Sequence, residues 1–161
     1  MIRKLTEKDR NDFMCLSNNV LKVLPRSDFF ICMTREEEKV LFNDSFCIVY
    51  GVFDDNKLIA ISCLYHHQQN DIANYLSLSG DMCAEIGHCM VLPQYRGKNL
   101  MVDLNKQLII EAKKIGIKYL LATAHPENIS SNKSLSKLGM KNIGKFMRNK
   151  NYDRNIYFME L

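Results

Sequence analysis

Several features that would narrow the function of this chain are absent from its 161 residues. No run approaches the roughly 18 to 20 apolar residues that a membrane-spanning helix needs. The segment before Thr6 lacks the apolar stretch of a signal peptide, and no internal repeat or low-complexity tract is present. These absences argue against a membrane protein or a repeat array, and they predict one cytoplasmic domain covering residues 1–161.

The six cysteines lack the spacing of a metal site or of a disulfide framework. They are scattered, with no C-x-x-C pair, and several lie inside apolar runs such as residues 46–49 and 61–64. No pair of the four histidines has metal-ligand spacing either. We therefore expect reduced thiols that serve as small apolar side chains, and no bound metal.

Neither sign of charge is in large excess: the chain has 22 Lys and Arg residues and 18 Asp and Glu residues. The net charge of +4 suits an anionic ligand such as a phosphorylated cofactor, but it is too small to argue for nucleic acid by itself. The basic segment from Lys141 to Arg154 contains Phe146 and Tyr152, and solvation of a strand face explains it as well as nucleic-acid binding does. We expect no nucleic-acid partner.

The spacing of apolar residues predicts seven strands and four main helices. The strands are expected at about 1–5, 45–53, 57–65, 83–92, 119–124, 141–148 and 154–161. The helices are expected at about 6–24, 34–41, 98–115 and 130–138, and residues 66–81 are expected to form a polar loop, with or without one helical turn. This order predicts an α+β fold with a mixed, mostly antiparallel six- to seven-stranded sheet and helices on both faces.

The stretch from residue 84 to residue 105 carries the strongest functional signal. A short apolar run ends at Val91-Leu92-Pro93, a basic loop containing Gly97 follows, and a helical apolar repeat then begins. A strand, a tight loop and a helix N-terminus in this order bring unpaired backbone N–H groups together. The stretch therefore predicts a binding site for a pyrophosphate.

Two motifs in this chain resemble those of the GNAT superfamily of N-acetyltransferases. Gln94-x-x-Gly97-x-Asn99 resembles the Q/R-x-x-G-x-G/A signature of that family. The stretch from Asn128 through Ser131 to Gly139-Met140 is similar to the family's region after the fifth strand. The order of elements over essentially the whole chain also fits, so the resemblance implies the GNAT fold.

The resemblance further implies acetyl-CoA, or another acyl-CoA, as the cofactor. Its pantetheine arm would pair with the backbone of the strand at 83–92, and the amides of residues 96–101 would hold its pyrophosphate, where the helix dipole adds positive charge. The cofactor-binding residues implied in this way are Met90, Val91, Gln94, Arg96, Gly97, Lys98, Asn99, Leu100, Met101, Asn128 and Ser131. A plain strand-to-helix turn with a solvated basic pair remains the alternative for this loop.

Asn99 departs from the family pattern, which has Gly or Ala at this position. Asn tolerates unusual backbone dihedral angles better than most residues do, but its side chain still has to be accommodated. The resemblance therefore predicts cofactor binding and leaves its strength open.

Glu85 is the candidate general base, because the resemblance matches it to a glutamate that some family members keep on the fourth strand. Strand alternation places Glu85, Gly87 and Cys89 on one face and His88 and Met90 on the other. A base is useful because amines are largely protonated at pH 7. The alternative is a glutamate at the end of a sheet that pairs with a surface Arg or Lys.

The source of the proton for the departing thiolate is open. The family often has a Tyr seven residues after the motif's Asn, where this chain has Leu135. Tyr152 and Tyr157 are candidates from the terminal strands, and His66 and His67 either face the acceptor or are solvated. We expect His88 to pack beneath the helices and His125 to shape a turn before Pro126.

The leading hypothesis is an acyl-CoA-dependent N-acetyltransferase in which a primary amine attacks acetyl-CoA directly. The amine could belong to a small molecule or to a protein, and the free edges of the sheet leave a homodimer open. The alternative is a non-catalytic CoA-binding regulatory or sensing module of the same fold, motivated by Asn99 and Leu135.

Overall fold

A seven-stranded sheet forms the centre of the computed structural model, which describes residues 1–66 and 69–161. The strands follow the spatial order β1-β2-β3-β4-β5-β7-β6. They are β1 (Ile2–Lys4), β2 (Cys47–Asp54), β3 (Lys57–His66), β4 (Cys83–Val91), β5 (Tyr119–Ala124), β6 (Lys141–Arg148) and β7 (Tyr152–Glu160). Neighbouring strands are antiparallel except for β4 and β5, which are parallel. The predicted mixed, mostly antiparallel sheet is confirmed.

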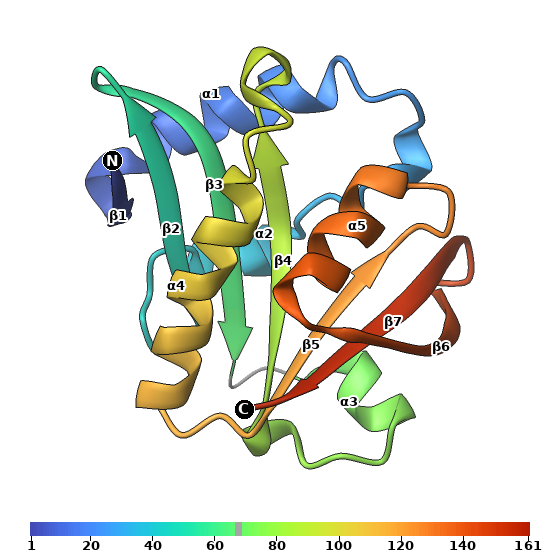
Figure 1. Cartoon of the computed structure of the whole chain (residues 1–161). Coiled ribbons are helices and arrows are strands. Elements are labelled where there is room, and N and C mark those ends of the chain that lie inside the picture. Colours follow the sequence, from blue (N-terminus) through green and yellow to red (C-terminus); the bar gives the residue numbers. More distant parts are fainter. Residues whose placement is uncertain (67–68) are drawn as a thin grey trace.

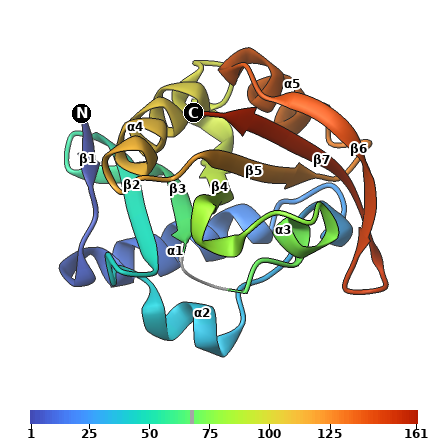
Figure 2. The same ribbon diagram turned by 90° about the horizontal axis from the view of Figure 1, so that it is seen from below.

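Helices cover both faces of this sheet (Figures 1 and 2). One face carries α4 (Leu100–Lys114) and α5 (Ile129–Leu138), and the other carries α1 (Arg10–Leu21), α2 (Arg35–Val40) and the short α3 (Asp71–Tyr75). The last of these is a helical turn within the stretch predicted as a loop. None of the helices in residues 1–66 and 69–161 is both long and apolar enough to cross a membrane.

Local capping explains where two of the helical segments begin. The Thr34 hydroxyl accepts from the Glu37 amide at 3.2 Å, and the Glu37 carboxylate accepts from the Thr34 amide at 2.7 Å. Before α1, the Thr6 amide likewise donates to the Asp9 carboxylate at 2.9 Å. The helix starts predicted near residues 6 and 34 can be found from spacing, because a capping box depends on residues three positions apart.

The apolar repeat of α4 packs against the sheet along its middle, where Leu104, Leu108 and Ala112 are fully buried. Leu100 and Met101 at its start are half-buried and line the cleft. Ile115 is 39% exposed, because α4 ends at Lys114, one residue before the predicted end. Ile117 enters the core in its place, just before β5.

Candidate active site

The two parallel strands at the centre of the sheet separate towards their carboxyl ends (Figure 1). Their pairing runs from Cys83 opposite Tyr119 to Ile86 opposite Ala122 and stops there. A cleft of about 810 Å³ opens at this point, bordered by β4, β5, α5 and the start of α4. Among the described residues, the backbone groups on the edge of β4 beyond Ile86 have no strand partner on the β5 side, so they are available to an extended ligand.

A β-bulge in β4 changes which side chains face which helices. Ile61 pairs with Met90 and Cys63 with Gly87, so His88 and Cys89 together face Ser62. The bulge puts the φ angle of His88 at +48°, in the left-handed region.

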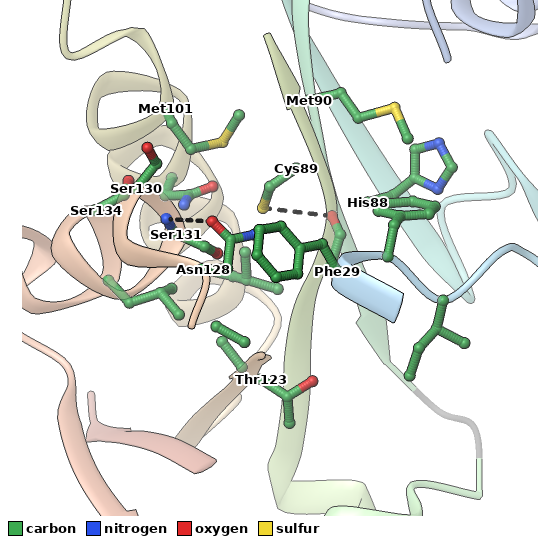
Figure 3. Close-up of a pocket in the computed structure, with 18 of the residues that line it drawn as sticks. Phe29, His88, Cys89, Met90, Met101, Thr123, Asn128, Ser130, Ser131 and Ser134 are labelled. Carbon is green, nitrogen blue, oxygen red and sulfur yellow. Dashed lines mark hydrogen bonds between the residues drawn. The ribbon is translucent and has the colours of Figure 1, made fainter. Parts of the chain in front are cut away.

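The predicted alternation beyond Gly87 is therefore wrong. Cys89 turns towards α4, where its Sγ lies 3.3 Å from the Ser62 hydroxyl, which in turn donates to Asn105. His88 turns towards α1, and its Nε2 lies 2.9 Å from the Ser17 hydroxyl. Figure 3 shows the two side chains on opposite sides of the strand. Burial raises the pKa of the Cys89 thiol to about 11 and lowers that of His88 to about 4.

The loop between β4 and α4 presents backbone N–H groups to the cleft. In the described structure, the amides of residues 97–101 donate to no protein acceptor. Gly97 has a φ of +79°, and a β-carbon built there would meet no atom within 4 Å. The predicted pyrophosphate loop is thus an open cradle at the start of a helix.

The backbone conformation of Asn99 shows how this residue is accommodated at a position where the family pattern has Gly or Ala. Its φ is +58°, a left-handed value that Asn adopts more readily than most residues. Its Oδ1 accepts a hydrogen bond from the Lys137 ammonium of α5 at 3.0 Å. This contact ties the side chain to α5, and the adjacent backbone amides stay free.

The start of α5 forms the opposite wall of the cleft (Figure 3). Asn128 caps this helix, because its Oδ1 accepts from the Ser131 amide at 3.2 Å. Leu135 is buried in the core. The preceding residue, Ser134, lines the cleft, and its buried hydroxyl has no hydrogen-bond partner in the described part of the chain. Sequence reasoning missed Ser134, whose exposure to the cleft depends on how α5 packs.

Basic side chains gather at the cofactor end of the cleft. The cationic residues that line it there are Arg96, Lys98, Lys133 and Lys137. Arg96 also donates from Nε to the carbonyl of Val91 at 3.3 Å, so one predicted cofactor-pairing carbonyl already has a protein partner. All the predicted cofactor-binding residues line the cleft except Gln94, which is exposed in the short 3-10 turn at Pro93–Tyr95.

Glu85 lies where β4 and β5 begin to separate, and Arg148 from β6 binds its carboxylate. Arg148 donates to both Glu85 oxygens at 2.6 and 3.1 Å and to both Asp71 oxygens at 2.8 and 3.0 Å. Asn70 adds a hydrogen bond to Glu85 at 3.1 Å. Burial acts to lower the pKa of Arg148, but the negative charges of Glu85 and Asp71 raise it above its usual value. The glutamate is therefore an oriented, ion-paired group that lines the cleft.

The two tyrosine candidates lie outside the cleft, and His66 belongs to its lining. The Tyr157 hydroxyl donates to Asn132 Oδ1 at 2.8 Å, and neither Tyr157 nor Tyr152 lines the cleft. His66 is buried at the end of β3 and lines the cleft, so the solvated alternative is wrong for it. His67 lies outside the described residues.

Of the other two histidines, His125 shapes a turn as predicted, since its Nδ1 accepts from the Glu127 amide at 3.1 Å. His88 packs on the Phe13 ring of α1 with centroids 5.0 Å apart, as predicted, but it also lines the cleft. No cluster of three or more His, Cys, Asp or Glu side chains converges as a metal site within the described ranges.

Comparison with known proteins agrees with this geometry. The sequence matches the acetyltransferase (GNAT) family over residues 16–140. The chain belongs to the GNAT acetyltransferase family. None of the curated proteins compared with it gives a significant match.

Solved structures share the fold over nearly the whole chain. A GNAT-family acetyltransferase from Streptococcus pneumoniae is 20% identical, with a TM-score of 0.77 and coverage of 100% of this chain and 98% of that one. An N-acetyltransferase from Staphylococcus aureus Mu50 is also 20% identical, with a TM-score of 0.75 and coverage of 99% and 97%. The yncA protein of Salmonella typhimurium, solved with its cofactor acetyl-CoA, is 15% identical, with a TM-score of 0.73 and coverage of 100% and 93%.

Acetyl-CoA is the cofactor of this family member, and the cleft fits it on structural grounds. The free amides of residues 97–101 and the surrounding ammonium and guanidinium groups suit a pyrophosphate. The open edge of β4 suits the amide groups of a pantetheine arm, and the buried Ser134 hydroxyl is a donor with no partner in the described part of the chain. The chain is thus an acetyltransferase with a shaped and charged cofactor cleft.

Proposed function

We propose that this acetyltransferase transfers the acetyl group to a primary amine by direct attack, with Glu85 receiving the amine proton. The observation that carries the proposal is the position of Glu85, which lines the cleft where β4 and β5 separate. A carboxylate at this point lies beside the stretch of β4 edge that is open to the cofactor.

In this proposal the cofactor is held mainly by backbone groups. Met90 and Val91 would offer the edge of β4, and the amides of residues 97–101 would bind the pyrophosphate. Arg96 and Lys98 would add positive charge, while Asn128 and Ser131 would contact the pantetheine and phosphate regions from α5. Gln94 would act from outside the cleft, since its side chain does not line it.

The surroundings of Glu85 suit a proton acceptor that acts through a water molecule. Arg148 and Asn70 hold both carboxylate oxygens, so the orientation of the group is fixed and a direct contact with the amine is crowded. Acetyl-CoA would supply the acetyl group as a thioester. The amine nitrogen would gain the acetyl group and lose one proton, and CoA would leave as a thiolate. The cluster of Glu85, Arg148 and Asp71 carries one positive and two negative formal charges, and its net charge of −1 attracts an ammonium ion.

A non-catalytic CoA-binding module is the second candidate, and one observation favours it. Leu135 lies in the core, at the position where the family often has a tyrosine to protonate the departing thiolate. A thiolate is a tolerable leaving group without such help, which keeps the catalytic proposal ahead.

The test is a thiol-release assay with acetyl-CoA and a broad panel of primary amines, comparing the wild type with Glu85→Gln. We expect kcat/KM to fall about 10²-fold at pH 7, the usual size of a general-base contribution. The deficit should shrink as the pH approaches the amine's pKa, because free amine then forms without a base. Glu36→Gln, on the exposed side of α2, is the matched control and should retain wild-type rates.

Two results would overturn the proposal. Tight CoA binding without turnover of any amine would establish the non-catalytic module. An unchanged pH profile in Glu85→Gln, with a folded protein and normal CoA affinity, would assign the base to another group.

A further inference from the structure

Arg154 at the start of β7 is a buried cation without a carboxylate partner. Its side chain lines the cleft, and the residue is 3% exposed. It donates to the backbone carbonyls of Asp153 at 2.7 Å and Asp28 at 2.8 Å. No carboxylate oxygen lies within 4.0 Å of its nitrogens among residues 1–66 and 69–161. A buried charge in such surroundings is costly unless an opposite charge joins it.

Asp28 and Asp153 are the acidic residues whose charges act on Arg154, but neither carboxylate forms an ion pair with it in the described structure. The Asp28 carboxylate pairs with Arg26 at 2.6 Å, and Asp153 is exposed on the other face of β7. Burial and the positive charge of Arg148 lower the pKa of Arg154, the opposite of the shift at Arg148. Arginine nevertheless stays protonated in proteins, so Arg154 keeps a positive charge that the carboxylates of Asp28 and Asp153 and the Tyr152 ring, 5.3 Å from its Cζ, offset only in part.

The hydrogen-bonding capacity of Arg154 is also only partly used. A guanidinium has five N–H donors in a planar fork that matches a carboxylate. Two of these N–H groups donate to backbone carbonyls, so the other three have no hydrogen-bond acceptor among the described residues. Arg154 therefore offers both charge and free donors to an anionic group in the cleft.

The sheet register puts Arg154 on the same face as Glu85. Glu85 pairs with Leu121, and Leu121 pairs with Phe158, which lies four residues from Arg154 in β7. Side chains at paired positions, and at even spacing along a strand, share a face. This face of the cleft thus holds a cluster of net charge −1 at Glu85 and, at Arg154, a positive charge that forms no ion pair among the described residues. A zwitterion matches this pair of charges.

We propose that the acceptor is a free amino acid, with its carboxylate bound by Arg154 and its amino group beside Glu85. The inference rests on the proposed acetyl transfer to an amine and names the substrate class of that site. Phe29 follows Asp28, whose carbonyl holds Arg154, and its ring packs 5.1 Å from His125 at the same end of the cleft. An apolar surface is therefore available to the amino-acid side chain.

The test compares free leucine, methionine and phenylalanine with the corresponding amino-acid amides, which keep the amine and the side chain but lose the negative charge. For the wild type we expect kcat/KM at least tenfold higher with the acids, mostly through a lower KM. Arg154→Gln should remove this preference by raising the KM for the acids, and Arg154→Lys should keep part of it. Arg35→Gln removes an exposed guanidinium at the start of α2, outside the cleft lining, and should leave the preference intact.

Calorimetric binding of the same acids and amides to the CoA-saturated protein gives a second readout that needs no turnover. Equal kcat/KM for acid and amide in the wild type, or an equal loss with both in Arg154→Gln, would overturn the amino-acid inference and leave acetyl transfer standing. Carboxylate-dependent binding without turnover of any amine would contradict the proposed function and uphold the Arg154 site. The wild-type comparison holds even where Arg154→Gln fails to fold.

Discussion

His88 shows how strongly a single position can depend on its surroundings. The bulge in β4 gives it a left-handed backbone, and its ring lies between Phe13 and Phe30 with Nε2 against the Ser17 hydroxyl. Non-glycine residues with such dihedral angles persist where the surrounding structure enforces them, often at functional sites. Here the contacts with α1 hold the ring on the cleft wall, and burial favours its neutral form.

The neutral state of His88 predicts a pH-dependent loss of stability. Its pKa is about 4 in the folded protein and about 6.5 when unfolded, so the unfolded state takes up the proton first as the pH falls. The contribution is complete above pH 6.5 and is lost towards pH 4, by about 2 to 3 kcal/mol. Urea unfolding from pH 7.5 to pH 4 should show this fall in the wild type and a smaller one in His88→Asn. Equal pH dependence in the two proteins would contradict it.

At the scale of elements, the junction of α4 with α5 controls the cofactor loop. Asn99 begins α4 with a positive φ, and Lys137 of α5 holds its side chain. The free amides of the loop depend on this backbone conformation, and so does the fit of a pyrophosphate. The contact between Asn99 and Lys137 therefore links the motif at residues 94–99 to the motif at residues 128–140 across the cleft.

Substitutions at Asn99 should separate the backbone effect from the side-chain effect. Asn99→Ala should destabilise the protein by about 1 kcal/mol, because a residue other than Gly or Asn is strained at positive φ. Asn99→Gly relieves that strain and should cost less, with CoA affinity retained. Lys137→Met removes the hydrogen bond and one positive charge of the cleft lining without changing the backbone at Asn99, so it serves as the control for stability. Denaturant unfolding and calorimetry measure both quantities, and an alanine variant as stable as the glycine variant would refute the backbone argument.

Across the whole molecule, the cleft is divided by charge. Ammonium and guanidinium groups line the end at the residue 96–101 loop, whereas the end near Glu85 holds Glu37, Asp71 and Glu85 together with Arg148 and Arg154. The +4 net charge does not reveal this division, because it sums over both ends. The fold separates the two groups by placing α4 and α5 on one face of the sheet and α1 to α3 on the other (Figure 2).

This charge separation predicts that CoA affinity depends on salt. Raising NaCl from 50 to 500 mM should weaken CoA binding about three- to tenfold, because screening shortens the reach of exposed charges to a few ångström. The combined change Lys98→Gln and Lys133→Gln should flatten this dependence. Lys145→Gln, on the exposed strand β6 and outside the cleft lining, should leave it unchanged. A dissociation constant that is independent of salt would show that backbone amides alone bind the phosphates.

The sequence by itself determined the features that depend on near neighbours in the chain. Strand β5 was predicted at its observed bounds because an apolar run between Gly116 and Pro126 has few alternatives. The helix caps and the strand-loop-helix at Gly97 follow from residues a few positions apart, so they too were readable.

Tertiary structure alone decided the features that join distant segments. Arg148 reaches Glu85 across 63 residues, and the lack of an ion pair at Arg154 among the described residues depends on the pairing of the Asp28 carboxylate with Arg26. The bulge at His88 arises from the register between β3 and β4, which reversed the facing predicted for Cys89. Local pattern carries no information on register or on long-range pairing, since both depend on how the whole sheet assembles.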